Sequence, residues 1–187
     1  MPELTTNQKG AIAEAAITKA AFELGIEVYR PALEGGRYDM IFALENGRLL
    51  RVQCKWAARH KDVLVIRCYS CRRAIDGMRV RHYTSDEIDV IAVYSPDTGC
   101  CYLIPPRLWD GHRVVHLRLK PTRNNQRRLI NWAKDYEFAA RLSALGPIAQ
   151  LGERSDGIRK VVGSSPTGSI ITKPQQQLRV GWLGLRA

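Results

Sequence analysis

The sequence is short of acidic residues and contains no long apolar run. Its 187 residues include 18 Asp and Glu against 29 Lys and Arg, which gives a formal net charge of +11. No apolar stretch approaches the roughly 18 to 20 residues that cross a bilayer. Glu3, Glu14 and Lys19 fall where a signal peptide would be apolar. We therefore expect a cytoplasmic chain that does not enter a membrane.

Cysteine is also sparse. Five cysteines are an odd number, and with no export signal they argue for reduced thiols and against a disulfide framework. Cys68 and Cys71 form one Cys-x-x-Cys pair, but no second pair follows, which leaves a zinc-stabilised interaction protein as an alternative with little support. The sequence also lacks a G-x-S-x-G elbow and a glycine-rich phosphate loop, so hydrolases of those classes and a small-molecule cofactor are not expected.

The excess of positive charge predicts a polyanionic partner, because basic surfaces bind nucleic acid and release its counterions. The charge is concentrated in two stretches. Residues 48–81 hold ten Lys or Arg against two Asp, and residues 107–128 hold seven against one. We expect double-stranded DNA as the partner, and solvated surface charge on an ordinary basic protein is the alternative.

Hydrophobic periodicity predicts an α/β protein. Residues 5–25 carry apolar side chains at helical spacing, with Thr5 as a possible N-cap and Gly25 at the end. Alternation predicts strands, and Asn46-Gly47 between two of them predicts a hairpin. The predicted strands cover residues 26–30, 38–44, 48–55, 62–68, 88–94 and 100–104, the last two also as a hairpin, and a second helix is predicted over residues 125–142.

Two segments lack such a pattern. Residues 72–81 hold four Arg and few apolar side chains, so we expect an exposed basic loop that reaches into a groove. From residue 143 on, Gly, Ser, Pro and Gln become frequent and the periodicity ends, which predicts a disordered, low-complexity tail. The expected organisation is one domain over residues 1–142 and a tail over residues 143–187.

Four polar residues on these elements suggest hydrolysis of a phosphodiester: Glu14 on the first helix, Asp39 at the start of a strand, and Gln53 and Lys55 on the next strand. Gln53 and Lys55 are two positions apart and share one strand face. Mg²⁺ prefers oxygen ligands, which Glu14, Asp39 and Gln53 supply. Lys55 would orient or deprotonate the attacking water and offset negative charge.

The same residues allow an interpretation without chemistry. Gln53 and Lys55 would then form the solvated face of a strand. Asp39 would pair with Arg37 or Arg51, and the helix acid with a neighbouring base. Such surface ion pairs are common and contribute little to stability.

Several blocks of sequence, in this order, resemble the PD-(D/E)xK nucleases and, more narrowly, the group I intron homing endonucleases of cyanobacterial type. The blocks are residues 9–14, 37–39, 50–55, 83–94, 102–105, 123–126 and 132–136, so the resemblance covers residues 5–140. It implies a restriction-endonuclease-like core, with a mixed central β-sheet flanked by helices. It also implies a homo-oligomer that is a dimer of dimers.

The resemblance implies a role for each of the four polar residues. Asp39 would be the metal-binding acid, Glu14 the helix-borne acid, and Gln53 a metal-site residue. Lys55 would be the catalytic lysine. The wider superfamily usually has Asp or Glu where this chain has Gln53, which removes a negative charge and weakens metal affinity, but the intron-encoded branch itself resembles Q-x-K.

DNA contacts are predicted for basic side chains in and beside the two basic stretches: Arg67, Arg72, Arg73, Arg79, Arg81, His82, Arg123 and Arg127. A small domain that must cut two strands is expected to act as a dimer or tetramer. Two alternatives stay open. A Holliday-junction resolvase or repair nuclease on the same core would require a branched junction, where a homing endonuclease would cut a linear duplex with one specific sequence. An inactive basic DNA-binding module would bind DNA without Mg²⁺ and not cut it.

The tail suggests where the target lies. Residues 146–154 and 161–169 resemble the peptides obtained when a transfer RNA gene is translated in frame. This would place the reading frame against such a gene, where introns of this type reside. An ordinary disordered basic tail is the alternative.

Overall fold

A computed structural model describes residues 3–33, 35–122 and 128–145 of the chain. The chain divides into two units, residues 1–151 and 152–187, and the second lies outside the described residues. Arg123, Arg127 and the predicted tail from residue 146 onward also lie outside them. The domain boundary at residue 142 therefore stays a prediction.

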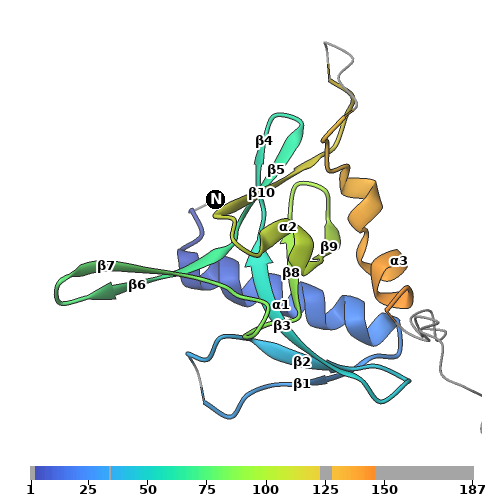
Figure 1. Cartoon of the computed structure of the whole chain (residues 1–187), viewed down its shortest axis with the longest axis horizontal. Coiled ribbons are helices and arrows are strands. Elements are labelled where there is room, and N and C mark those ends of the chain that lie inside the picture. Colours follow the sequence, from blue (N-terminus) through green and yellow to red (C-terminus); the bar gives the residue numbers. More distant parts are fainter. Residues whose placement is uncertain (1–2, 34, 123–127, 146–187) are drawn as a thin grey trace, which may run out of the picture. The chain divides into compact units, whose positions relative to one another are not determined.

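A five-stranded mixed sheet forms the centre of the described fold (Figure 1). Its strands, in spatial order, are β1 (Glu27–Tyr29), β2 (Met40–Ala43), β3 (Leu49–Trp56), β8 (Val90–Ser95) and β9 (Cys100–Ile104). β3 and β8 are parallel, and all other neighbours are antiparallel. Both predicted hairpins, β2–β3 and β8–β9, are confirmed, and Gly47 has the positive φ of 79° that glycine adopts without strain.

Helices cover one face of this sheet. α1 (Thr6–Glu23), which confirms the first predicted helix, begins at a capping box and packs Ile17 against β3 and β8. α3 (Phe138–Ser143) adds Phe138, whose ring meets Phe42 of β2 edge to face with centroids 6.0 Å apart. Among the described residues, no helix is both long enough and apolar enough to cross a membrane.

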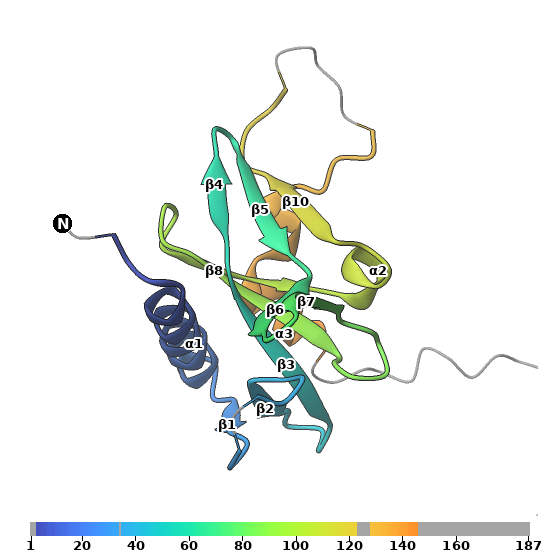
Figure 2. The same ribbon diagram turned by 90° about the vertical axis from the view of Figure 1, so that its left-hand side faces the viewer.

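A smaller sheet and a short helix cover the opposite face (Figure 2). The sheet contains, in spatial order, β10 (Val114–Arg118), β5 (Val63–Arg67) and β4 (Ala58–His60), and the helix is α2 (Pro106–Trp109). Leu64, Ile66 and Trp109 share a buried cluster with Ile91 and Val93 of β8. The central sheet is thus buried on both faces, and the predicted α/β fold with a mixed, helix-flanked sheet is confirmed.

Residues 69–82 form a two-stranded antiparallel ribbon, called the ribbon below, where the sequence predicted a loop. It consists of β6 (Tyr69–Ala74) and β7 (Gly77–His82), and it extends away from the other elements in Figure 1. Every residue of β7 is exposed, so the apolar alternation that reveals a strand in a sequence is missing. The remaining local signal is the turn pair Asp76-Gly77, in which Gly77 has a φ of 122°.

The helix predicted over residues 125–142 is wrong in its described part. The chain forms instead a 3-10 turn, η1 (Ala133–Tyr136), followed by the short α3. Trp132 and Glu137 have extended ψ values of 133° and 134°, which interrupt a continuous helix. Leu129 is fully exposed, with a φ of 58°. Apolar residues at helical spacing were therefore misleading here.

Candidate active site

The polar face of β3 carries two of the four predicted site residues. Leu50, Val52 and Cys54 are buried against the helical layer, so Gln53 and Lys55 lie on the opposite side of the strand. The predicted alternation is confirmed. Gln53 is nevertheless only 7% exposed, which contradicts the interpretation of this face as solvated.

Asp39 is held against the same strand by backbone and side-chain hydrogen bonds. Its N–H donates to the Val52 carbonyl at 2.9 Å, which aligns the start of β2 with β3. Its Oδ2 accepts hydrogen bonds from the Cys54 N–H at 2.8 Å and from Gln53 Nε2. The fold therefore brings Asp39 and Gln53 into direct contact.

The two arginines considered as partners of Asp39 bind other carboxylates. Arg37 Nε donates to Glu87 Oε2 at 2.9 Å. Arg51 Nη2 donates to Asp89 Oδ1 at 3.0 Å. The alternative in which Asp39 forms a surface ion pair with Arg37 or Arg51 is therefore wrong.

Burial shifts the pKa values of Asp39 and Lys55 in opposite directions. It raises the pKa of Asp39; the Cys54 N–H opposes this shift, and the charge of Glu14 adds to it. Burial lowers the pKa of Lys55, and the charge of Asp39 opposes that shift. Perturbed pKa values of this kind are typical of groups that take part in chemistry.

Lys55 has two hydrogen-bond acceptors, and both lie where the ribbon joins the body of the fold. Its Nζ donates to the Tyr83 hydroxyl at 2.8 Å and to the Tyr69 carbonyl at 3.2 Å. Tyr69 is the first residue of the ribbon, and Tyr83 directly follows the last. Lys55 therefore connects the site to the ribbon.

Glu14 approaches the site from α1. Its Oε2 binds Arg30 Nη1 at 2.8 Å, which is the pairing with a base that the interpretation without chemistry predicts for this acid. Glu14 and Asp39 also line one cleft between α1 and residues 30–39. The structure therefore places all four predicted residues at one locality, with Glu14 at its edge.

Comparisons with known proteins identify the family and the fold. The family model for PD-(D/E)XK endonucleases matches residues 4–139. The chain belongs to the PD-(D/E)XK endonuclease family. Among solved structures, this endonuclease is similar to a bacterial homing endonuclease, I-Ssp6803I, with a TM-score of 0.61 and 23% sequence identity over 76% of this chain and 95% of that one. At this identity the likeness shows the fold. No sequence among the curated proteins matches the chain significantly.

Endonucleases of this family generally use divalent metal ions, and the donor atoms at the site fit a hard cation. The carboxylates of Asp39 and Glu14 and the amide oxygen of Gln53 are all oxygen ligands. Burial raises the pKa of Asp39, so a cation beside its carboxylate would offset the cost of burying that charge. In the described part of the chain, no three His, Cys, Asp or Glu side chains gather to hold a metal, so the amide of Gln53 is needed to complete this set.

The predicted DNA contacts gather on the ribbon, where the strand register assigns each to a face. One face carries Arg72, Arg79 and Arg81, and the other carries Arg73 and His82. Arg67 lies at the end of β5, outside the ribbon.

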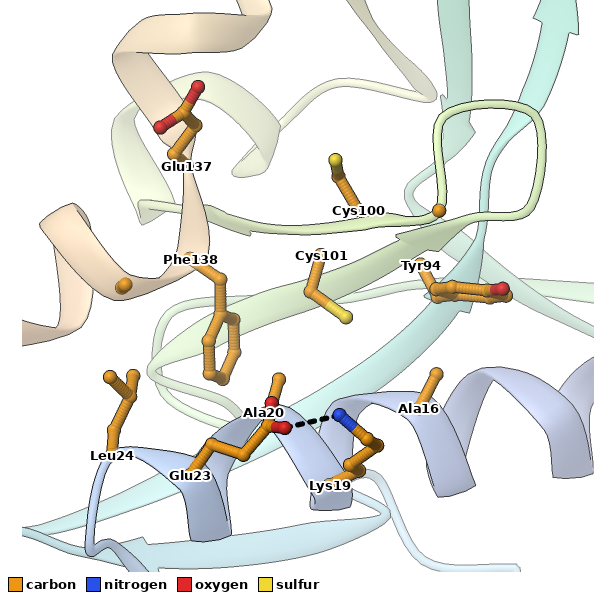
Figure 3. Close-up of a pocket in the computed structure, with 12 residues that line it drawn as sticks. Ala16, Lys19, Ala20, Glu23, Leu24, Tyr94, Cys100, Cys101, Glu137 and Phe138 are labelled. Carbon is orange, nitrogen blue, oxygen red and sulfur yellow. Dashed lines mark hydrogen bonds and ion pairs between the residues drawn. The ribbon is translucent and has the colours of Figure 1, made fainter.

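A further hollow lies between α1, the β8–β9 hairpin and the start of α3 (Figure 3). Lys19 and Glu23 form an ion pair at its α1 side, and Phe138 faces it from α3. None of the residues that line this hollow is a predicted site residue.

Sequence reasoning assigned no role to Arg30, Tyr83 or the Arg37–Glu87 pair. Arg30 and Tyr83 contact site residues that are 16 and 28 positions away in the chain. No local pattern in the sequence reports contacts of that separation. Arg37 was recognisable only as a neighbour of Asp39.

Proposed function

We propose that this protein is a Mg²⁺-dependent endonuclease that cuts double-stranded DNA at a specific sequence, as an intron-encoded homing endonuclease. The observation that carries this proposal is the position of Lys55. Lys55 shares one face of β3 with Gln53, which contacts Asp39. Its ammonium also contacts the root of the ribbon, the end at which Tyr69 and His82 join the body of the fold. A hydrolytic site and a DNA-binding element therefore meet at one side chain.

Each site residue has a distinct role in this proposal. Asp39, Gln53 and Glu14 would hold the metal through oxygen atoms. When bound, Mg²⁺ would polarise the scissile phosphate and lower the pKa of a bound water. Lys55 would orient the attacking water or accept its proton, and its lowered pKa favours the second role.

The ribbon is suited to bind DNA by its charge and dimensions. It contains four arginines against the single acid Asp76. Six residues per strand give it a length of about 20 Å, and a two-stranded ribbon fits the major groove of B-form DNA. Phosphate contacts by its arginines would position the protein, and contacts to base edges would supply sequence specificity.

One site of this kind hydrolyses one strand, so a double-strand cut requires two copies. We therefore propose a homo-oligomer, either a dimer or a tetramer.

The experiment is Mg²⁺-dependent cleavage of a plasmid that carries an intronless transfer RNA gene. The wild type should make one defined double-strand cut, and Asp39→Ala and Lys55→Ala should bind the plasmid without cutting it. Asp97→Ala and Lys134→Ala remove the same charges from exposed positions elsewhere and should cut normally.

Other outcomes would replace the proposal. Cleavage of branched junctions but not of the linear gene would favour a resolvase. Binding that is independent of Mg²⁺, with no cleavage of any substrate, would indicate an inactive DNA-binding module. Cleavage that survives both substitutions would show that the chemistry lies elsewhere.

A further inference from the structure

The side chain of Lys55 is held by residues at the root of the ribbon. A lysine has four flexible methylene groups, so an isolated ammonium samples many positions. Here Nζ has two acceptors, the Tyr83 hydroxyl at 2.8 Å and the Tyr69 carbonyl at 3.2 Å. It also lies 4.7 Å from the centroid of the Tyr83 ring. These contacts restrict the ammonium to one side of the site.

Tyr83 is itself held in place. Its side chain is buried at 3% exposure, and the guanidinium of Arg37 lies 4.5 Å from its ring centroid. Burial raises the pKa of Tyr83, so its hydroxyl stays protonated at neutral pH, and its oxygen accepts a hydrogen bond from the Lys55 ammonium.

Arg37 connects this tyrosine to the root of the ribbon. It donates to Ser70 Oγ at 3.0 Å and to the His82 carbonyl, one acceptor on each ribbon strand. Glu87 compensates its charge, with 2.9 Å between Nε and Oε2. Arg37 is also two residues before Asp39, so the same segment fixes the root and supplies the metal-binding acid.

Arg72 provides a second connection between the ribbon and this segment. Its Nη2 donates to the Gly35 carbonyl at 2.7 Å. Gly35 has a φ of 89°, and a Cβ there would lie 3.0 Å from the same guanidinium nitrogen. The positive φ of Gly35 is a conformation that other residues adopt only with strain, so glycine suits this position.

We propose that Tyr83 is a positioning residue for Lys55, and that Arg37 holds Tyr83 at the root of the ribbon. The inference rests on the proposed function, in which Lys55 acts on the water or the phosphate. Alignment of a reacting group accounts for a large part of enzymatic rate, and a small displacement reduces that rate. The root therefore joins the element that contacts DNA to the side chain that reacts.

The first test measures the order of the Lys55 ammonium in the full chain without DNA or metal. A hydrogen-bonded, buried ammonium exchanges its protons slowly and gives a separate ¹H–¹⁵N resonance, which Lys55→Arg would assign by its loss. Tyr83→Phe should abolish or broaden this resonance. The matched control is Tyr102→Phe, because Tyr102 is 4% exposed and its hydroxyl donates to Thr98 Oγ1 at 3.3 Å, outside the site.

The second test measures single-turnover cleavage of the plasmid with protein in excess. Tyr83→Phe removes one hydrogen bond to a charged group, so its rate should fall about tenfold. Its affinity for the plasmid should stay within about twofold of the wild type. Tyr102→Phe should change neither quantity, and the two variants should unfold at similar temperatures.

The positioning role is refuted if the Lys55 resonance persists in Tyr83→Phe, or if the rate falls equally in Tyr102→Phe. It is also refuted if weaker DNA binding accounts for the whole loss of rate. If the wild type cuts no DNA, the proposed function fails separately. Loss of the resonance in Tyr83→Phe alone would then still support Tyr83 as the residue that fixes Lys55.

Discussion

The site on β3 and the ribbon are built in opposite ways, although they meet at Lys55. Gln53 and Asp39 are fixed by hydrogen bonds to the central sheet, and Gln53 is 7% exposed. The ribbon exposes every residue of β7 and carries most of the predicted DNA contacts. In the site Gln53 is buried and Asp39 and Lys55 are half-buried, whereas the ribbon extends into solvent.

Because of this difference, the site shifts pKa values, whereas the ribbon attracts phosphates. Burial shifts the pKa values of Asp39 and Lys55, because it penalises the charged form of each. Exposure leaves the arginines able to attract phosphates over a distance set by ionic strength. Chemistry and recognition should therefore respond to different substitutions.

The largest expected effect follows from removing the charge of Asp39. Asp39→Asn keeps an oxygen that accepts hydrogen bonds from the Cys54 N–H and from Gln53, but it lacks the charge that attracts a metal. Cleavage should fall by about 10³-fold or more, and Mn²⁺ affinity, measured by calorimetry, by about tenfold or more. The free energy of unfolding should not decrease, because a buried charge is lost. Equal losses in Asp97→Asn, at an exposed turn, would contradict this role.

Two valines test whether the body and the ribbon differ in packing. Val52 on β3 is fully buried, and Val80 on β7 is 42% exposed. Val52→Ala should lower the free energy of unfolding by about 2 kcal/mol, because it leaves a cavity. Val80→Ala should change it by less than about 0.5 kcal/mol. Urea denaturation measures both, and similar values for the two variants would mean that the ribbon packs against another surface.

Arginines of the ribbon should control DNA affinity and its salt dependence. The double variant Arg73→Gln, Arg79→Gln removes one charge from each ribbon face. Affinity should fall about tenfold, and the slope of log K against log salt should decrease by about 2 in magnitude. Arg48→Gln is the control, since this exposed arginine directly precedes β3, whereas Lys55 lies near the other end of that strand. An equal change in the control would indicate that net charge alone governs binding.

The smallest expected effect is on the pH dependence of stability, to which two carboxyl groups contribute with opposite sign. A hydrogen bond from Arg37 lowers the pKa of Glu87, so its contribution to stability is present above the unfolded value near 4.5 and is lost as pH falls. Burial raises the pKa of Asp39, so its contribution is present below the unfolded value near 3.8 and is lost as pH rises through the folded value.

Urea denaturation of Glu87→Gln and Asp39→Asn over this acid range measures both trends. Glu87→Gln should be less stable than the wild type at neutral pH, and the difference should shrink as the solution is acidified. The free energy of unfolding of Asp39→Asn should increase relative to that of the wild type as pH rises. If both variants follow the wild-type curve, neither carboxyl group is perturbed as the contacts indicate.

Local sequence patterns were sufficient for the elements that bury at least one apolar face. α1 and the two hairpins follow from apolar spacing and turn residues such as Asn46-Gly47. The alternation on β3 also placed Gln53 and Lys55 on one side of the strand. These predictions succeeded because burial of an apolar face imposes the period of the element on the sequence.

The two wrong predictions, the loop at the ribbon and the second helix, are also explained by burial and packing. The ribbon buries neither face, so it leaves no alternation and was predicted as a loop. The segment after Leu129 has helical spacing, but Trp132 pairs with Arg118 of β10 and Glu137 with Tyr102 of β9, which keeps both residues extended. Tertiary contacts therefore override local preference in that segment. The Tyr83–Lys55 contact arises in the same way, from chain segments that only the fold brings together.

The separation of chemistry from recognition is tested most directly on a single DNA duplex that the wild type cuts. Binding and single-turnover cleavage would be measured for Lys55→Met and for the Arg73→Gln, Arg79→Gln double variant, the latter at saturating protein. The account predicts that Lys55→Met binds with wild-type affinity and does not cut, whereas the saturated double variant cuts at the wild-type rate. Cleavage by Lys55→Met, or a saturated double variant that fails to cut, would contradict it.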